Sequence, residues 1–305
     1  MKRIMVSFLL FMPSLSWAND ACTNPEAYTI DKRCYVTEEQ KKQKPYNAVA
    51  TLVLNDGRTH CSGTVVKRQG LTMDDVGYFL YTAKHCVDLN HDNITDDLLR
   101  IRLPSNQEFN AKLVKQGNLD YQDPASQTGD WAKYRLVTIE QNSADGVKDS
   151  LDGAYVKIND SFARGAKNVR IIGYGKLKIM SDQEIQDFKN EYADFIDETD
   201  TNNANDTHTD DGGIYGNGVT MFVFNNHNRF NDNLLKVSKC YQDANTKFTG
   251  CQGWGGNSGG GAFDDNGNLM WIVTLGHYQI GGKDHASITG GENFLPFGRL
   301  PNVKK

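Results

Sequence analysis

Short apolar runs separated by polar, glycine-containing segments recur along most of the chain. The runs cover residues 47–54, 60–67, 78–82, 99–103, 109–114, 131–139, 169–174, 220–224, 234–237, 262–263 and 269–275. Most have the length of β-strands and are rich in β-branched and aromatic residues. Asp56-Gly57 between the first two runs, and 264–268 between the last two, predict hairpin turns. The pattern predicts an all-β protein, either a barrel or a sandwich.

One stretch, residues 181–196, follows a helical period instead. The apolar residues that share one face of this helix are Ile185, Phe188, Tyr192, Phe195 and Ile196. An almost wholly polar segment, 197–211, comes next. We therefore expect residues 176–219 to form a partly helical surface insertion in the β domain.

The first 18 residues have the pattern of a secretory signal. Lys2 and Arg3 precede nine apolar residues, 4–12, and small residues lie at the positions that a signal peptidase reads before a cut after Ala18. The apolar stretch is far shorter than the roughly 20 residues needed to span a bilayer. We expect a cleaved signal peptide at 1–18 and a secreted or periplasmic protein.

The chain has the composition of a globular protein, with 38% apolar and 23% charged residues. Its net charge of −5 gives no basic excess for nucleic-acid binding, and no stretch after the signal is apolar enough for membrane insertion. We expect residues 19–44 to be a polar N-terminal extension and 45–305 to be the main domain.

Six cysteines follow the signal, and an even number in an exported chain predicts three disulfides. They are Cys22, Cys34, Cys61, Cys86, Cys240 and Cys251. Sequence alone allows about 15 pairings, and pairing of nearest neighbours gives 22–34, 61–86 and 240–251. The sequence contains no close cysteine pair of the C-x-x-C type, so its cysteines do not indicate a zinc site.

Three short segments supply the residues of acyl-transfer chemistry; they are 81–86, 128–132 and 255–261. They contain His85, Asp130 and Ser258 in that order. A serine hydroxyl is a weak nucleophile until an imidazole takes its proton, and a buried carboxylate orients that imidazole. Glycines around a serine allow two backbone N–H groups to face a developing oxyanion.

These segments resemble those of the chymotrypsin-like (trypsin-like) serine peptidases. Residues 82–86 (TAKHC) resemble the family's TAAHC segment with Lys84 in place of alanine, and 256–260 (GNSGG) resemble its GDSGG segment. The likeness covers about residues 45–281. It implies an all-β fold of two antiparallel six-stranded β-barrels with the site in the cleft between them.

The spacing agrees with this resemblance. His85 and Asp130 are 45 residues apart, which is about the separation in the family's template. Asp130 and Ser258 are 128 residues apart, against about 93 in the template. The excess is close to the size of the expected insertion.

The resemblance implies a role for each of these residues in a serine endopeptidase that needs no cofactor. Ser258 would be the nucleophile, His85 the general base and then acid, and Asp130 the residue that orients His85. The backbone N–H groups of Gly256 and Ser258 would form the oxyanion hole. The expected partners are protein or peptide substrates, and the expected state is a monomer.

The same likeness implies further contacts. Substrate-binding positions would be Gln252, Gly253, Thr274, Leu275 and Gly276. No acid lies at the base of this pocket, which disfavours a trypsin-like preference for arginine or lysine. Disulfides 61–86 and 240–251 would match family disulfides, whereas 22–34 has no counterpart.

Asn257 departs from the trypsin-like pattern, in which an aspartate precedes the nucleophile and pairs with a newly released N-terminus. An amide carries no charge and can satisfy its hydrogen bonds locally, so it needs no cationic partner. No IVGG-like start lies upstream of the domain. In both respects the sequence resembles bacterial glutamyl endopeptidases, which also carry GNSG.

Three alternative hypotheses stay open on the sequence. A binding module could keep the fold without turnover. Residues 256–260 also fit the G-x-S-x-G elbow of α/β-hydrolase esterases, but the following glycines would not hold the required helix. Asp88, Asn90 and Asp92 lie at spacings of a calcium loop but lack its later glycine and glutamate.

Overall fold

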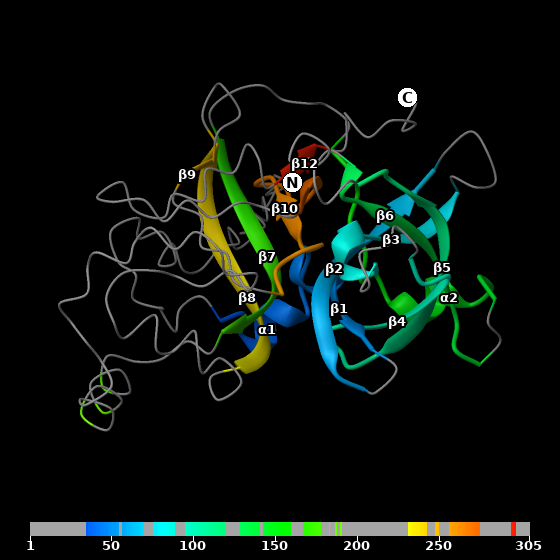
Figure 1. Cartoon of the computed structure of the whole chain (residues 1–305), viewed down its shortest axis with the longest axis horizontal. Helices are drawn as coiled ribbons and strands as arrows, with labels where there is room; N and C mark the ends of the chain where they lie inside the picture. The colour runs from blue at the N-terminus through cyan, green and yellow to red at the C-terminus, as the bar shows by residue number, and fades with distance from the viewer. Residues whose placement is uncertain are drawn as a thin grey trace, which may run out of the picture.

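The structure of the chain is a computed structural model. It describes residues 35–54, 57–69, 76–88, 95–119, 129–140, 143–159, 167–177, 231–242, 248–249, 256–274 and 294–296, with single positions 183, 187 and 190. Most of these residues lie in antiparallel strands (Figure 1). No helix in the described part has both the length and the apolar character that crossing a membrane requires.

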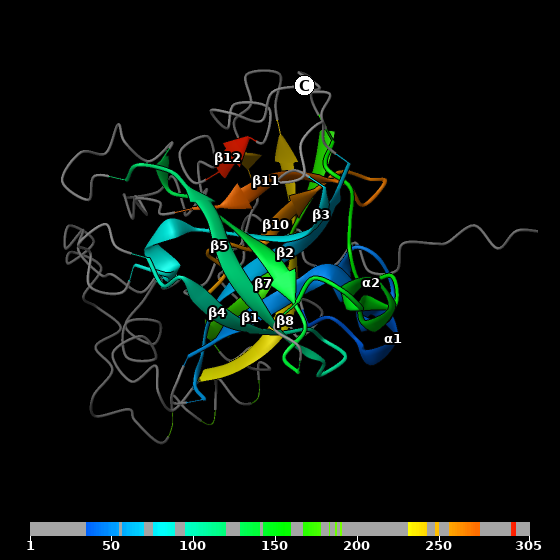
Figure 2. The same ribbon diagram turned by 90° about the vertical axis from the view of Figure 1, so that its right-hand side faces the viewer.

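Six strands in the first half of the chain close into a barrel. They are β1 (Val49–Val53), β2 (Thr59–Arg68), β3 (Gly77–Thr82), β4 (Leu98–Arg102), β5 (Glu108–Gln116) and β6 (Ala132–Val137). Their order is β1-β2-β3-β6-β5-β4, and pairing of β1 with β4 closes the ring. Figure 2 shows this barrel in front of the second sheet.

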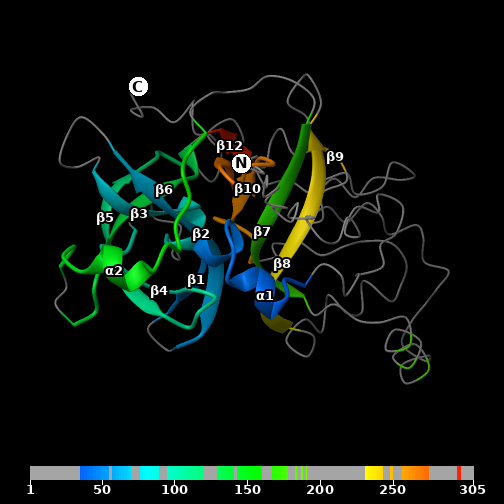
Figure 3. The same cartoon turned by 180° about the vertical axis from the view of Figure 1, so that it is seen from behind.

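Six further strands form a second sheet. They are β7 (Lys167–Leu177), β8 (Asn231–Gln242), β9 (Phe248–Thr249), β10 (Gly261–Phe263), β11 (Leu269–Val273) and β12 (Phe294–Pro296). Their order is β12-β11-β10-β7-β8-β9. The predicted fold class is confirmed, because antiparallel strands form one closed barrel and a second six-stranded unit beside it (Figures 1 and 3).

The apolar runs of the sequence locate the strands well in the described residues. The predicted run 78–82 is β3, while 169–174 is the middle of the longer β7. The turn at 55–56 and the run 220–224 lie outside the described residues. Most of the predicted helix 181–196 does too, although the three positions described there are helical.

Two apolar cores explain how the sheets pack. One fills the barrel, with Val65, Leu80 and Ile101 among its members. The other lies between the sheets and joins residues of both, including Tyr81 of β3 and Ile172 of β7. Because side chains alternate along a strand, Ile171 points to the opposite face of β7, into a smaller cluster.

The last part of the predicted extension 19–44 packs on the folded domain. Val36 is buried in the core between the sheets, and its N–H donates to the carbonyl of Leu235 on β8 at 3.0 Å. Helix α1 (Glu38–Lys41) follows, capped by reciprocal hydrogen bonds between Thr37 and Gln40. The apolar pattern does not predict this helix, because four residues are too few to show a period.

The remaining helical elements are short. They are η2 (Tyr46–Ala48), η4 (Lys84–Cys86) and α2 (Val147–Leu151), of which η2 and η4 are single 3₁₀ turns. Figure 3 shows α2 on the barrel and α1 near the base of β8. The turn η4 matters most because it carries His85 out of β3.

A disulfide joins Cys61 of β2 to Cys86 of η4. It is one of the three pairs that nearest-neighbour pairing gave and one that the resemblance implied. Cys22, Cys34 and Cys251 lie outside the described residues, as does the side chain of Cys240. The other two pairs therefore remain predictions.

Removal of this disulfide should destabilise the barrel. The linked residues are 25 positions apart, and closing a loop of that size restricts the unfolded chain by about 3 kcal/mol. The double variant Cys61→Ala/Cys86→Ala should lose about that much free energy of unfolding in a urea titration. Unreduced peptide mapping of the wild-type protein should recover the two cysteines in one linked peptide, and a free Cys86 thiol would contradict the structure.

Candidate active site

A single carboxylate holds His85 in two ways. Oδ1 of Asp130 accepts from the backbone N–H of His85 at 2.9 Å, and Oδ2 lies 2.8 Å from ring atom Nδ1. A carboxylate only accepts hydrogen bonds, so the proton of the neutral ring is assigned to Nδ1. The lone pair is then on Nε2, the atom that a general base needs.

The pairing of strands brings these two residues together across 45 positions of sequence. Strand β3 pairs with β6 so that Thr82 lies opposite Ala132. His85 follows the first of these residues and Asp130 precedes the second. The carboxylate of Asp130 is fully buried, whereas the His85 side chain keeps 15% of its surface exposed.

Lys84, next to His85, is almost fully buried at 2% exposure. Its Nζ donates to the carbonyl of Gly117 at 3.1 Å. Burial lowers the pKa of this amine, and the nearby carboxylates of Asp88 and Asp130 act in the opposite direction. Lys84, which stands where the TAAHC segment has alanine, is therefore a buried amine near the carboxylate that holds His85.

The segment that carries Asp130 is packed backbone to backbone. The N–H of Gly117 donates to the carbonyl of Trp131 at 2.8 Å. A Cβ atom on Gly117 or on Gly129 would overlap backbone atoms of the facing segment. Lys84 and these two glycines thus fix where the carboxylate lies. No motif in the sequence signals this contact, because it joins segments that are distant along the chain.

Ser258 lies on the loop that leads into β10. The loop turns through positive φ angles at Gly256 (97°) and Gly259 (80°), a backbone region that favours glycine. Three backbone hydrogen bonds hold it: Gly260 N–H to Asn257, Gly259 N–H to Val273, and Ser62 N–H to the carbonyl of Ser258, all between 2.7 and 2.8 Å. The loop is therefore fixed to both sheets.

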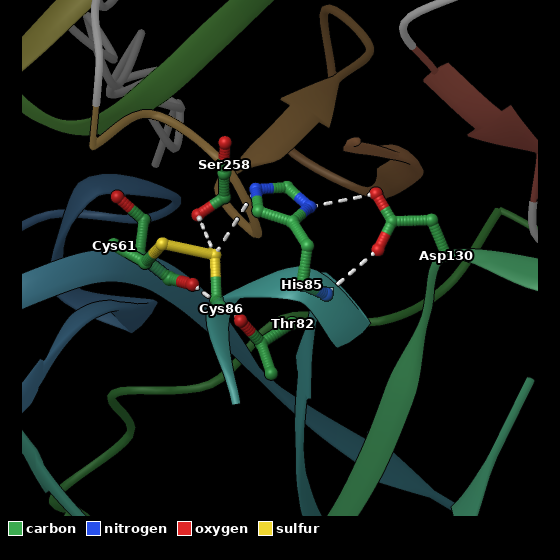
Figure 4. Close-up of polar contacts among 7 residues, drawn as sticks. Cys61, Thr82, His85, Cys86, Asp130 and Ser258 are labelled. Atoms are coloured by element: carbon green, nitrogen blue, oxygen red, sulfur yellow. Dashed lines mark hydrogen bonds and ion pairs between the residues drawn. A yellow bond between two sulfur atoms is a disulfide. The ribbon is translucent and has the colours of Figure 1, made fainter. Parts of the chain in front are cut away.

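The structure brings Ser258 and His85 to the same side of the disulfide (Figure 4). Sγ of Cys86 lies 3.6 Å from Nε2 of His85 and 3.7 Å from the carbonyl oxygen of Ser258. A disulfide sulfur carries no proton, so these are contacts rather than donated hydrogen bonds. Among the described residues no hydrogen bond joins Oγ of Ser258 to Nε2 of His85; such bonds are often long in enzymes without substrate.

The N–H groups of Gly256 and Ser258 have no hydrogen-bond acceptor among the described residues. Both belong to the loop that carries the Ser258 hydroxyl. Unpaired backbone donors at a nucleophile are the chemical feature of an oxyanion hole. The arrangement can therefore combine a base, its orienting carboxylate, a hydroxyl and two free donors.

Asn257 differs from the expectation in one respect. It is buried at 3% exposure, and its Oδ1 has no hydrogen-bond partner in the described part of the chain. The expectation that this amide satisfies its hydrogen bonds locally is wrong for Oδ1. Strand β7 packs closely against this oxygen, since a Cβ on Gly173 would lie 3.1 Å from it.

The other predicted site residues are placed only in part. Thr274, directly after β11, is buried, while Gln252, Gly253, Leu275 and Gly276 lie outside the described residues. Asp88 of the calcium-loop candidate is fully buried, and its companions Asn90 and Asp92 are not described. The substrate pocket and the calcium loop therefore remain predictions.

One group of close potential metal ligands, His60, Cys61 and Cys86, occurs in the described part of the chain. Both sulfurs are used in the disulfide, and metals bind the thiolate form. This group does not fit a metal ion while the disulfide is intact.

Gly259 should be very sensitive to substitution. In Gly259→Ala the new Cβ would overlap the carbonyl oxygen of Ser62 and the hydroxyl of Thr82, and φ is already positive. We expect a loss of about 3 kcal/mol or more in the free energy of unfolding, from strain and overpacking together. Denaturant titration measures it.

Gly57→Ala is the matched control for this experiment. Gly57 has nearly the same φ, 82°, but a Cβ there would meet nothing within 4 Å. Backbone strain alone should cost about 1–2 kcal/mol. Equal losses in the two variants would contradict the close contact at Gly259.

Comparison with known proteins finds similarity in solved structures but not in sequence. No family model matches the chain, and no curated protein matches its sequence. Among solved structures, the chain is similar to a Glu endopeptidase in complex with MPD, at 13% identity and a TM-score of 0.41, over 79% of this chain and 84% of that one. It is also similar to the serine endoprotease from Yersinia pestis, at 16% identity and a TM-score of 0.41, over 79% of this chain and 58% of that one. The fold and the site of this chain follow from its own strand order and contacts.

Proposed function

We propose that this protein is an exported serine endopeptidase that cleaves protein or peptide substrates through an acyl-enzyme. The observation that carries the proposal is the pair of hydrogen bonds that fix His85 on the buried Asp130, next to the loop of Ser258. The two N–H groups of that loop that have no acceptor in the described part of the chain support it. The signal pattern at 1–18 and the disulfide at 61–86 support an oxidising compartment.

Each proposed step uses a group of this site. Oγ of Ser258 attacks the scissile carbonyl as its proton passes to Nε2 of His85. The buried carboxylate of Asp130 stabilises the imidazolium that forms, and the N–H groups of Gly256 and Ser258 stabilise the oxyanion. His85 then gives the proton to the leaving amine as the C–N bond breaks.

Water then hydrolyses the acyl-enzyme, with His85 acting first as base and then as acid. His85 takes a proton from water, the hydroxide attacks the acyl carbonyl, and the bond to Oγ breaks. Ser258 recovers its proton from His85, so no proton is gained or lost by the protein. The chemistry proposed needs no metal or organic cofactor.

A binding module that lost turnover is the second candidate. No observation on the described residues favours it, because each group named in the mechanism is present. The two functions differ in reactivity toward a fluorophosphonate, which phosphonylates an activated serine. A folded wild-type protein that stays unlabelled would favour the binding module.

The first functional prediction concerns the nucleophile. Ser258→Ala should abolish fluorophosphonate labelling and lower peptidase turnover by several orders of magnitude, because no other group can form the acyl-enzyme. Ser105→Ala, at an exposed position in the turn between β4 and β5, is the control and should label as the wild type does. Near-wild-type turnover in Ser258→Ala would overturn the assignment.

The second functional prediction concerns activation. Asn257 carries no charge, so it has no ion pair to make with a new N-terminus. The chain that enters at Tyr35 and Val36 is already paired with β8. Extra residues before Asn19 should therefore leave activity per labelled site within a few-fold of the unextended protein.

The control for this experiment is the same extension with a specific protease site placed before Asn19, assayed before and after cleavage. An inert extended form would contradict the prediction. So would activity that arises only after a cut within 19–44, with a new N-terminus bound at Oδ1 of Asn257.

A further inference from the structure

Ser62 is a single buried residue that joins the loop of Ser258 to both sheets. Its Oγ donates to the carbonyl of Gly256 at 2.7 Å and accepts from the N–H of Tyr174 on β7 at 2.7 Å. Its own N–H donates to the carbonyl of Ser258 at 2.8 Å. The residue is fully buried, so water does not compete for these groups.

A bulge in β2 gives Ser62 this direction. The register between β1 and β2 shifts so that Thr51 faces Ser62 while its neighbour Leu52 faces His60. Cys61 is the extra residue, with a positive φ of 51°. Bulges commonly turn side chains toward a functional site, and here the disulfide to Cys86 holds the bulged residue.

The hydroxyl of Ser62 is not free to rotate. One lone pair accepts from Tyr174, which leaves its proton to donate to Gly256. Thr82 adds a further link, because its hydroxyl donates to the carbonyl of Ser62 at 2.7 Å. The donor aimed at the Gly256 carbonyl is therefore preorganised by both sheets.

The hydrogen bonds to this loop also set the direction of its N–H groups. In a planar trans peptide, the C=O and the following N–H point in opposite directions. The carbonyl of Asn257 accepts from Gly260, so the N–H of Ser258 points away from that bond. Holding the carbonyl of Gly256 fixes the peptide that joins Gly256 to Asn257, and this peptide adjoins the one that carries the Gly256 N–H.

We infer that Ser62 is a positioning residue for the oxyanion hole: its hydroxyl holds the carbonyl of Gly256, beside the bond from its backbone N–H to Ser258, so that the loop presents the N–H groups of Gly256 and Ser258. The inference rests on the proposed function. In this inference Ser62, a residue of the first barrel, keeps the loop in its active form through a neutral hydroxyl.

Ser62→Ala tests this inference with a fluorophosphonate as the probe. The variant leaves the carbonyl of Gly256 and the N–H of Tyr174 without a partner, so the loop can relax. The maximal labelling rate, kinact, should fall on the order of 10- to 100-fold, somewhat less than the loss of a whole oxyanion donor. The half-saturating concentration KI should change little, because ground-state binding does not use the hydroxyl.

Thr64→Val is the matched control. Thr64 lies two residues further along β2, is fully buried, and its hydroxyl has no hydrogen-bond partner in the described part of the structure. Replacing that hydroxyl with a methyl group changes the same strand and removes no hydrogen bond seen in the described part of the structure. Its kinact should stay within twofold of the wild-type value.

The final extent of labelling separates positioning from folding. A purely structural role for Ser62 would reduce the fraction of protein that labels at saturation but leave kinact unchanged. Ser62→Gly, which leaves no methyl group at this position, is used if Ser62→Ala does not fold. A kinact within twofold of wild type in the folded variant would overturn the inference alone, whereas a wild-type protein that never labels would overturn the proposed function and the inference with it.

Discussion

The contact between the bulge of β2 and the loop before β10 is the constraint on which the site depends. Ser62 binds the loop at two carbonyls, and Gly259 lies so close to it that a Cβ would overlap its backbone oxygen. Because backbone atoms cannot yield as a long side chain can, this contact fixes the distance between the two sheets. Ser258 is placed relative to His85 by the same contact.

Burial of charge is the second requirement of the site. Asp130 is fully buried, and the hydrogen bonds from His85 compensate for part of its lost hydration. The amine of Lys84 is buried in the same region and donates to a backbone carbonyl, and the Asp130 carboxylate favours its charged form against the effect of burial. A buried carboxylate in this setting keeps the imidazole in one tautomer and stabilises its charged form.

The sequence predicted the features that carry an apolar pattern or a recognisable motif, and it missed the contacts that carry neither. Strand β3 followed from its apolar run, and the pairing of His85 with Asp130 followed from the resemblance of their segments to a known family, with its matching order and spacing. The bulge at Cys61 did not follow from the sequence, because it depends on which residue of β1 lies opposite Cys61. Nor did the role of Ser62, since an isolated serine in a strand carries no signal of a partner 194 residues away.

The order of the site residues along the chain has a consequence for biosynthesis. The proposed base is at position 85, its carboxylate at 130 and the nucleophile at 258 of 305 residues. A ribosome therefore makes the nucleophile, and the strands β10 and β11 that support its loop, after the base and its carboxylate. Contacts of such long separation form late and slowly in folding. A growing chain that has passed residue 130 but not residue 258 thus contains the proposed base and its partner but no nucleophile, so the proposed site can assemble only after the second sheet has been made.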